Sequence, residues 1–191
     1  MPLLDLREAT FRRGASVLLR PVTLYVNAGQ RAELVCESNS AAGIAARMAS
    51  GIVKCTAGLV FVADFDPKVQ PAQVKRAVGF VPHVPPRNPF GPQAYFAYRA
   101  AMWGLDARGA VPRGMDLLAR LDGLSLDDAL SVAGAFLHEP SLIVMERPVD
   151  AVRDAAQAIL RADAGLFATY GPADRMNVAL GAEPASAVKT S

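Results

Sequence analysis

Residues 31–51, RAELVCESNSAAGIAARMASG, decide the fold. They begin as a short strand that ends in apolar residues at Cys36, and a polar loop follows at 37–40. A helix is expected over about 41–50, because Asn39 or Ser40 can cap its amino end. Strand-to-helix junctions of this kind commonly bind phosphate in α/β proteins, since backbone amides and the helix dipole point at the ligand.

The segments around this junction predict a mixed α/β chain. Strands are expected at 4–6, 17–26, 58–63, 78–81, 141–145, 165–169 and 176–180. A short helix is expected to open at Pro71, and further helices are expected at 93–103, 115–121, 126–137 and 149–160. This order predicts an antiparallel β subdomain, a parallel core sheet and a small helical insertion at about 88–137. We expect one unit over 1–184 and a disordered tail at 185–191, where residues are small and polar.

The amino-acid composition excludes several classes of function. A net charge of +2 over 191 residues, with 20% charged side chains, provides no broad basic field, so no nucleic-acid partner is expected. Four lysines and two histidines leave few places for chemistry that needs either residue. Cys36 and Cys55 are too few for a disulfide scaffold or a cysteine zinc site and fit a reducing cytoplasm, although a bridge between them stays open. No apolar run of about eighteen residues predicts a membrane span, and no signal peptide is expected.

Several short sequence segments resemble those of a known protein family. RMASG closes the first helix at 47–51, VGFVP precedes the insertion at 78–82, and LHEP precedes the apolar strand SLIVM at 137–145. With the order of elements, they make the chain resemble the nucleotide-binding domain of an ABC transporter, from Leu4 to Leu180. The resemblance implies a P-loop NTPase-like fold, MgATP as cofactor and a transmembrane transporter subunit as partner.

The phosphate-binding loop of that family departs from its pattern in this chain. The pattern G-x-x-x-x-G-K-[ST] uses glycines to wrap the phosphates, a lysine to contact them and a hydroxyl to bind magnesium. Ala42 stands at the lysine position and Gly43 at the hydroxyl position, with Ile44 after it. The full window is Cys36, Glu37, Ser38, Asn39, Ser40, Ala41, Ala42 and Gly43. We therefore expect ATP and magnesium binding to be lost or weak.

The other catalytic positions of the family are also altered. By resemblance, Glu146 follows the hydrophobic strand where a magnesium-linked Asp is expected, and Arg147 replaces the water-activating Glu. Arg147 cannot act as a general base, because it stays protonated. His83 stands at the family's Gln position and Tyr170 at its switch histidine. The phosphate-sensing Leu-Ser-Gly-Gly-Gln loop corresponds to GLSLDD at 123–128, whose aspartates would repel a triphosphate.

Aromatic residues admit two interpretations. Phe11 occupies the family's adenine-stacking position, but a packing role in a strand is favoured once the phosphate contacts are gone. The aromatic residues of the insertion are either the core of that small helical unit or an interface for a transmembrane subunit. They are Phe90, Tyr95, Phe96, Tyr98 and Trp103.

Three functions remain open at this stage. The favoured hypothesis is a non-hydrolysing ABC ATPase-like subunit, not an enzyme and without a metal site, at the inner face of the membrane. Its partners would be a transmembrane subunit, an active ABC ATPase subunit, or both, with a dimer as one arrangement. The alternatives are an ATP-binding subunit with an asymmetric or weakly active site, and a free-standing soluble scaffold or regulator.

Overall fold

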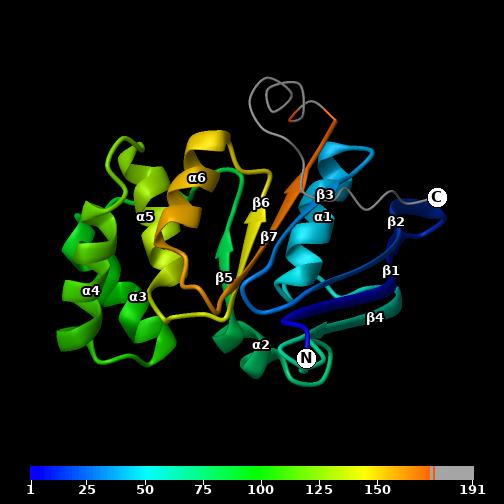
Figure 1. The fold of residues 1–191 in the computed structure, drawn as a ribbon, viewed down its shortest axis with the longest axis horizontal. Helices are drawn as coiled ribbons and strands as arrows, with labels where there is room; N and C mark the ends of the chain where they lie inside the picture. Colours follow the sequence, from blue (N-terminus) through cyan, green and yellow to red (C-terminus); the bar gives the residue numbers. More distant parts are fainter. Residues whose placement is uncertain (173, 175–191) are drawn as a thin grey trace.

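The structure, a computed structural model, describes residues 1–172 and 174. The strand predicted at 176–180 and the tail predicted at 185–191 lie outside these residues. Two sheets form the framework, and one carries the junction singled out in the sequence (Figure 1).

The antiparallel sheet contains the amino-terminal strands. β1 (Leu4–Arg13) lies between β2 (Ser16–Val26) and β4 (Ala57–Val62), with Leu4 opposite both Val26 and Val62. β1 bulges between Arg7 and Thr10, and Gly58 lies so close to this bulge that a Cβ there would overlap the backbone of Glu8. The sheet is the predicted antiparallel subdomain.

The parallel sheet has the order β3-β7-β6-β5, formed by β3 (Arg31–Val35), β7 (Gly165–Tyr170), β6 (Leu142–Glu146) and β5 (Val78–Val81). β6 is buried on both faces, as expected of a central parallel strand. Its Leu142 and Val144 pack toward α1 (Asn39–Ala49), and Ile143 and Met145 pack toward α5 (Leu126–Phe136) and α6 (Asp150–Ile159). The sheet thus separates two apolar cores.

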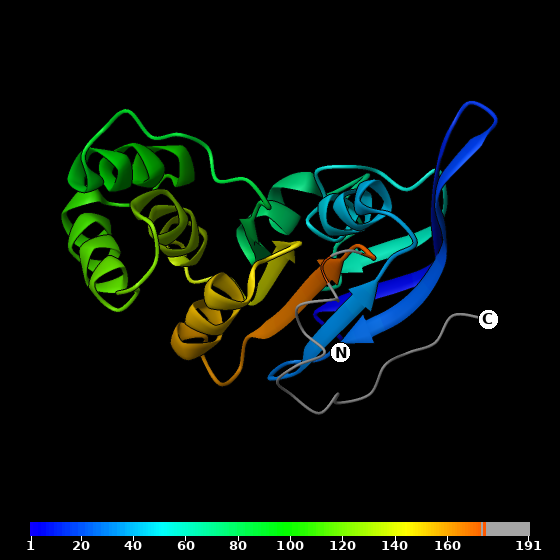
Figure 2. The same cartoon turned by 90° about the horizontal axis from the view of Figure 1, so that it is seen from above.

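The helical insertion gathers at the end of the molecule opposite the antiparallel strands (Figure 2). It contains α3 (Pro92–Trp103), α4 (Ala107–Ala119) and α5, and α2 (Pro71–Ala77) precedes β5. The predicted fold class is confirmed: a parallel core sheet, an antiparallel subdomain and a helical insertion.

Two helix boundaries differ from the predictions. α1 begins at Asn39 because Ser38, rather than Asn39 or Ser40, caps it, with the Ser38 side chain accepting a hydrogen bond from the Ala41 amide. α4 begins at Ala107 under an Asp106 cap instead of at 115, and it accommodates Pro112 in its interior. The predicted start at 115 is therefore wrong by about two turns.

Candidate functional site

The junction between β3 and α1 is shorter than a phosphate-wrapping loop. Only residues 36–38 lie between the strand and the helix, and the remaining five positions of the motif window, 39–43, are already helical. The Ala41 amide is bound by the Ser38 side chain at 3.1 Å, and the Ala42 amide donates to the Ser38 carbonyl at 3.0 Å. The Ser38 side chain thus occupies one of the four terminal donors and the Ala42 amide makes the first helical bond, so neither amide can cradle a phosphate.

The lysine and hydroxyl positions face the protein interior. Ala42 is fully buried, and Gly43 beside it is buried as well. Asn39 at the helix start lies against Gly171, where a Cβ would overlap the Asn39 side-chain oxygen. The segment after β7 thus closes over the loop that follows β3.

Glu146 at the end of β6 points across the sheet toward α1. Its carboxylate accepts from Arg47 Nη2 at 3.0 Å through Oε1 and at 3.3 Å through Oε2. The Glu146 side chain is 9% exposed, whereas that of Arg47 is 51% exposed. Arg47 lies one turn after Gly43 on the same helix face, so its guanidinium reaches the carboxylate alongside the glycine.

Magnesium, which the resemblance implies, can be tested against these groups. A Cβ at Gly43 would lie 2.6 Å from Glu146 Oε1, so the carboxylate occupies the space that a hydroxyl-bearing residue needs. Thr169, the register partner of Glu146, is fully buried, and within the described part of the chain its hydroxyl has no hydrogen-bond partner. One hydroxyl and one carboxylate already held by a guanidinium do not fit a divalent cation, which prefers several free oxygen ligands.

Arg147 joins three segments that follow neighbouring strands. Its guanidinium donates from Nε and Nη2 to Asp174, both at 2.8 Å, and its carbonyl accepts from His83 Nδ1 at 2.8 Å. Because the hydrogen bond from Arg147 favours the carboxylate, the pKa of Asp174 lies below its ordinary value. The Gly171 amide adds a further bond to Asp174 at 2.7 Å. These contacts hold the positively charged Arg147 guanidinium at the position where the family pattern has a general base.

Tyr170 and Phe11 lie away from this cluster. Tyr170 belongs to the core formed by α5 and α6, on the sheet face opposite α1, and its hydroxyl is 3.5 Å from Glu33 Oε1. Burial raises the pKa of Tyr170 to about 12, and the charge of Glu33 adds to the shift. Phe11 is half-buried and packs on the core around α1, as a strand residue does. The structure thus brings together Glu146, Arg147 and His83 but not these two aromatics.

No protein-family model matches the sequence. Solved structures of ABC transporter ATP-binding proteins match the fold. An ATP-binding subunit of an ABC transporter superposes with a TM-score of 0.71 at 18% identity, covering 89% of this chain and 80% of that one. The chain has the fold of ABC transporter ATP-binding subunits. An ABC transporter ATP-binding protein from Pyrococcus furiosus superposes with a TM-score of 0.67 at 14% identity, covering 87% of this chain and 90% of that one. CbiO1 of Clostridium perfringens is part of the ABC transporter complex CbiONQ. It superposes with a TM-score of 0.65 at 14% identity, covering 88% of this chain and 78% of that one.

The aromatic residues of the insertion in this ABC-type fold divide between the two interpretations. Phe96 is fully buried against Gly114 of α4, Tyr95 lies over Gly134 of α5, and Trp103 stacks on His138 with ring centroids 4.1 Å apart. These three form the core of the insertion. Phe90 and Tyr98 are more than half exposed and remain candidates for an interface.

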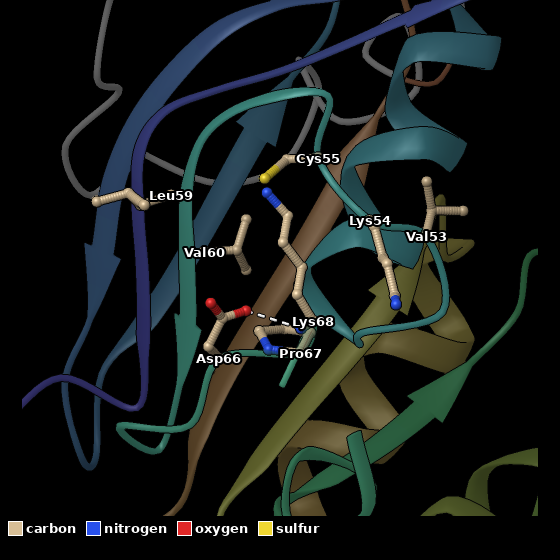
Figure 3. A pocket seen from close by; sticks show the side chains of 8 residues that line it. All are labelled: Val53, Lys54, Cys55, Leu59, Val60, Asp66, Pro67 and Lys68. Carbon is tan, nitrogen blue, oxygen red and sulfur yellow. Dashed lines mark hydrogen bonds between the residues drawn. The ribbon is translucent and has the colours of Figure 1, made fainter. Parts of the chain in front are cut away.

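A small hollow lies near the far end of α1 (Figure 3). It is lined by Cys55 and two of the four lysines: Lys68 extends toward Cys55, whereas Lys54 points the other way (Figure 3). Its volume is about 10 Å³, room for one water at most. Over residues 1–172 and 174, no cluster of three His, Cys, Asp or Glu side chains is placed to hold a metal. No helix in that part has the length and apolarity to cross a membrane.

Sequence reasoning missed three members of the site. Arg47, Asp174 and Gly171 contact the altered motif positions from elsewhere in the chain. For Arg47 a signal existed, since it lies four residues after Gly43 and one turn of helix places both on one face. Asp174 and Gly171 gave no local signal, because their contacts depend on how the segment after β7 folds back.

Proposed function

We propose that this chain is a non-hydrolysing ABC ATPase-like subunit that serves as a structural or regulatory partner in an ABC transporter-type complex at the inner face of a membrane. The observation that carries the proposal is the ion pair between Arg47 and Glu146, 3.0 Å long, at the position where the family pattern expects a magnesium-linked carboxylate. A resident guanidinium neutralises this carboxylate, and a divalent cation beside it would be repelled.

Two further features support loss of phosphoryl transfer. The buried Ala42 provides no charge for β- and γ-phosphates, and Arg147 is held by Asp174 where a base is needed. Positioned charges supply most of the rate enhancement in phosphoryl transfer, so losing the lysine, the hydroxyl and the base together removes the means of catalysis. The fold itself is retained, which fits a role in assembly.

Calorimetric titration of the full chain with MgATP tests the nucleotide part of the proposal. We expect no saturable heat at millimolar MgATP. A dissociation constant below about 100 μM, or about −5.5 kcal/mol, would contradict the dead site and favour a subunit that binds ATP weakly or asymmetrically. The variant Arg47→Met/Arg147→Glu is a sharper test. It removes the resident cation and supplies a carboxylate, yet we expect it to remain inactive because Ala42 and Gly43 are unchanged.

The partner part of the proposal rests on an exposed apolar strip at the insertion. Val84, Phe90, Tyr98 and Met102 are each more than half exposed, and they come from the loop after β5 and from α3. Exposed apolar side chains of this kind are candidates for a protein interface. We infer that this strip contacts a transmembrane subunit.

Crosslinking in membranes followed by mass spectrometry tests this contact. We expect a multi-span membrane protein to copurify with the wild-type chain and to be lost in Phe90→Ser/Tyr98→Ser. Tyr25→Ser is the matched control, since Tyr25 is 66% exposed but lies on the antiparallel sheet at the other end of the molecule. Recovery of soluble partners alone would overturn the transporter role in favour of a free-standing regulator.

A further inference from the structure

A second cleft lies on the sheet face opposite α1. It has a volume of about 120 Å³ and opens where β5 and β6 end, beneath the first turns of α5 and α6. Val81, Pro148 and Val152, all buried, form its apolar wall. The carboxyl ends of parallel strands are the usual place for ligand sites in α/β folds. The volume equals about four waters at about 30 Å³ each, enough for the end of one long side chain.

Three polar side chains line this cleft. His83 donates from Nδ1 to the Arg147 carbonyl, which can only accept, and this leaves Nε2 for another partner. Asp128 accepts from Ser125 Oγ at 2.6 Å through Oδ2, which leaves Oδ1 to face another donor. Ser131 is 9% exposed, and within the described residues its hydroxyl makes no hydrogen bond. The Ser131 hydroxyl opens onto the cleft, where it can bond a ligand or water.

The charges around the cleft favour a cation. Asp174 and Asp150 nearby are paired with Arg147 and Arg153 at 2.8 Å, but Asp128 forms no ion pair in the part of the chain that the structure describes. None of the residues that line the cleft is a lysine or an arginine. The cleft therefore offers an incoming donor one carboxylate that forms no ion pair within the described residues, and this carboxylate lies beside the partial positive charges at the amino ends of α5 and α6.

Exposed apolar residues flank the cleft in sequence. Val84 follows His83, Leu126 precedes Asp128 by two residues, and Val149 belongs to the cleft wall; each is more than half exposed. A polar pocket beside exposed apolar side chains is typical of a protein interface in which one anchor residue is inserted. A free small cation would leave these residues uncovered.

We propose that this cleft binds a lysine or arginine side chain of a partner protein, with apolar neighbours of that residue packing on Val84, Leu126 and Val149. The methylene stem would lie along Val81 and Val152, and the charged head would meet Asp128, Ser131 and His83. The inference does not rest on the proposed loss of nucleotide binding: the cleft shares His83 with the cluster around Glu146, but Ala42, Gly43 and Glu146 do not line it.

The test uses the full chain, labelled with ¹⁵N, and the blocked tripeptide acetyl-Leu-Arg-Val-amide as probe. Chemical-shift changes should concentrate at residues 81–84, 126–131 and 148–152 and saturate. The same peptide with citrulline, which has the shape of arginine without its charge, should bind at least about fivefold more weakly. Equal binding of the citrulline peptide would overturn the proposal, as would shifts centred elsewhere.

Three variants make the result specific. Asp128→Asn should weaken the arginine peptide at least about fivefold, whereas Asp127→Asn, in the same helical turn but outside the cleft, should change it less than about twofold. Ser131→Ala leaves the helix cap intact and should weaken binding about threefold, which guards against damage to α5 in Asp128→Asn. Unchanged affinity in both cleft variants would overturn the proposal. Ethylguanidinium binding as tightly as the peptide would also overturn it, since the site would then take a free cation.

Discussion

At the scale of single residues, the contact between Arg47 and Glu146 invites a double-mutant cycle. Arg47→Met should destabilise the protein by about 1–2 kcal/mol, less than for a fully buried pair because half of the arginine is exposed. Arg47→Met/Glu146→Gln should recover most of this loss, since no unpaired charge remains. Urea unfolding of Arg47→Met, Glu146→Gln and the double variant measures both values. Purely additive effects would mean that the two side chains do not interact.

Cys36 gives a second residue-scale prediction, concerning pH. Burial raises the pKa of the Cys36 thiol to about 11, and the charge of Glu37 adds to the shift. The thiolate is the reactive form, so alkylation of Cys36 in the native protein should keep accelerating above pH 9. In urea the rate should instead level off near the ordinary thiol pKa of about 8.5. Peptide mapping by mass spectrometry separates Cys36 from Cys55, and a native plateau near pH 8.5 would contradict the assignment.

Residues at fixed motif positions could be interpreted from the sequence, whereas their partners could not. Ala42 and Arg147 are visible as substitutions in a pattern whose chemistry is known. Glu146 and Arg47 lie 99 residues apart, and Arg147 and Asp174 lie 27 apart, so these contacts depend on strand order and helix placement. Tyr170 is the last residue of β7, one position beyond the strand predicted at 165–169, and the side to which its side chain points is fixed by the pairing of β7 with β6 and β3.

At the scale of elements, two glycines of α4 should respond to alanine in opposite directions. Gly114 lies under the Phe96 ring, where a Cβ would overlap ring atoms, so Gly114→Ala should destabilise the protein by about 1–3 kcal/mol. Gly109 has nothing within 4 Å, so Gly109→Ala should stabilise the helix by about 0.5–1 kcal/mol. Thermal unfolding followed by circular dichroism measures both. Equal effects would mean that Phe96 does not pack on α4 as described.

Most elements were predictable because their periodicity is strong, and the exceptions have local causes. Strands such as β6 and helices such as α5 match apolar runs and a clear cap. The start of α4 was missed because Pro112 normally ends a helix, whereas here the Asp106 cap begins it five residues before the proline is reached. The predicted start of α1 differs because three successive polar residues can each cap a helix, and in the structure the Ser38 side chain makes the capping bond.

At the scale of the whole molecule, His138 connects the insertion to the sheet and makes stability depend on pH. Its Nε2 donates to the Val78 carbonyl at 3.0 Å, and its ring stacks on Trp103. Burial holds the pKa of His138 below its ordinary value, and the nearby Arg99 and Arg113 lower it further. Because the folded state binds the His138 proton less readily than the unfolded state, the neutral ring stabilises the folded protein fully above about pH 6.5. This contribution to the free energy of unfolding is lost as the pH falls below that value.

We therefore expect the unfolding free energy to decrease from pH 6.5 to 5, and to decrease less in His138→Gln. His83→Gln is the matched control, since His83 lies on the exposed side and carries no such stack. Trp103 is the single tryptophan of the sequence, so its fluorescence reports directly on this contact. A flat profile in the wild type, or equal profiles in both variants, would contradict the role of His138.

The space taken by Glu146 beside Gly43 also bears on evolutionary reversibility. A serine at 43 would collide with that carboxylate, a lysine at 42 would bury an ammonium, and an acid at 147 would face Asp174. Each single step back toward the ATPase pattern therefore lowers stability before any chemistry could return. On the proposed function, regaining the ATPase pattern would therefore require several changes at once.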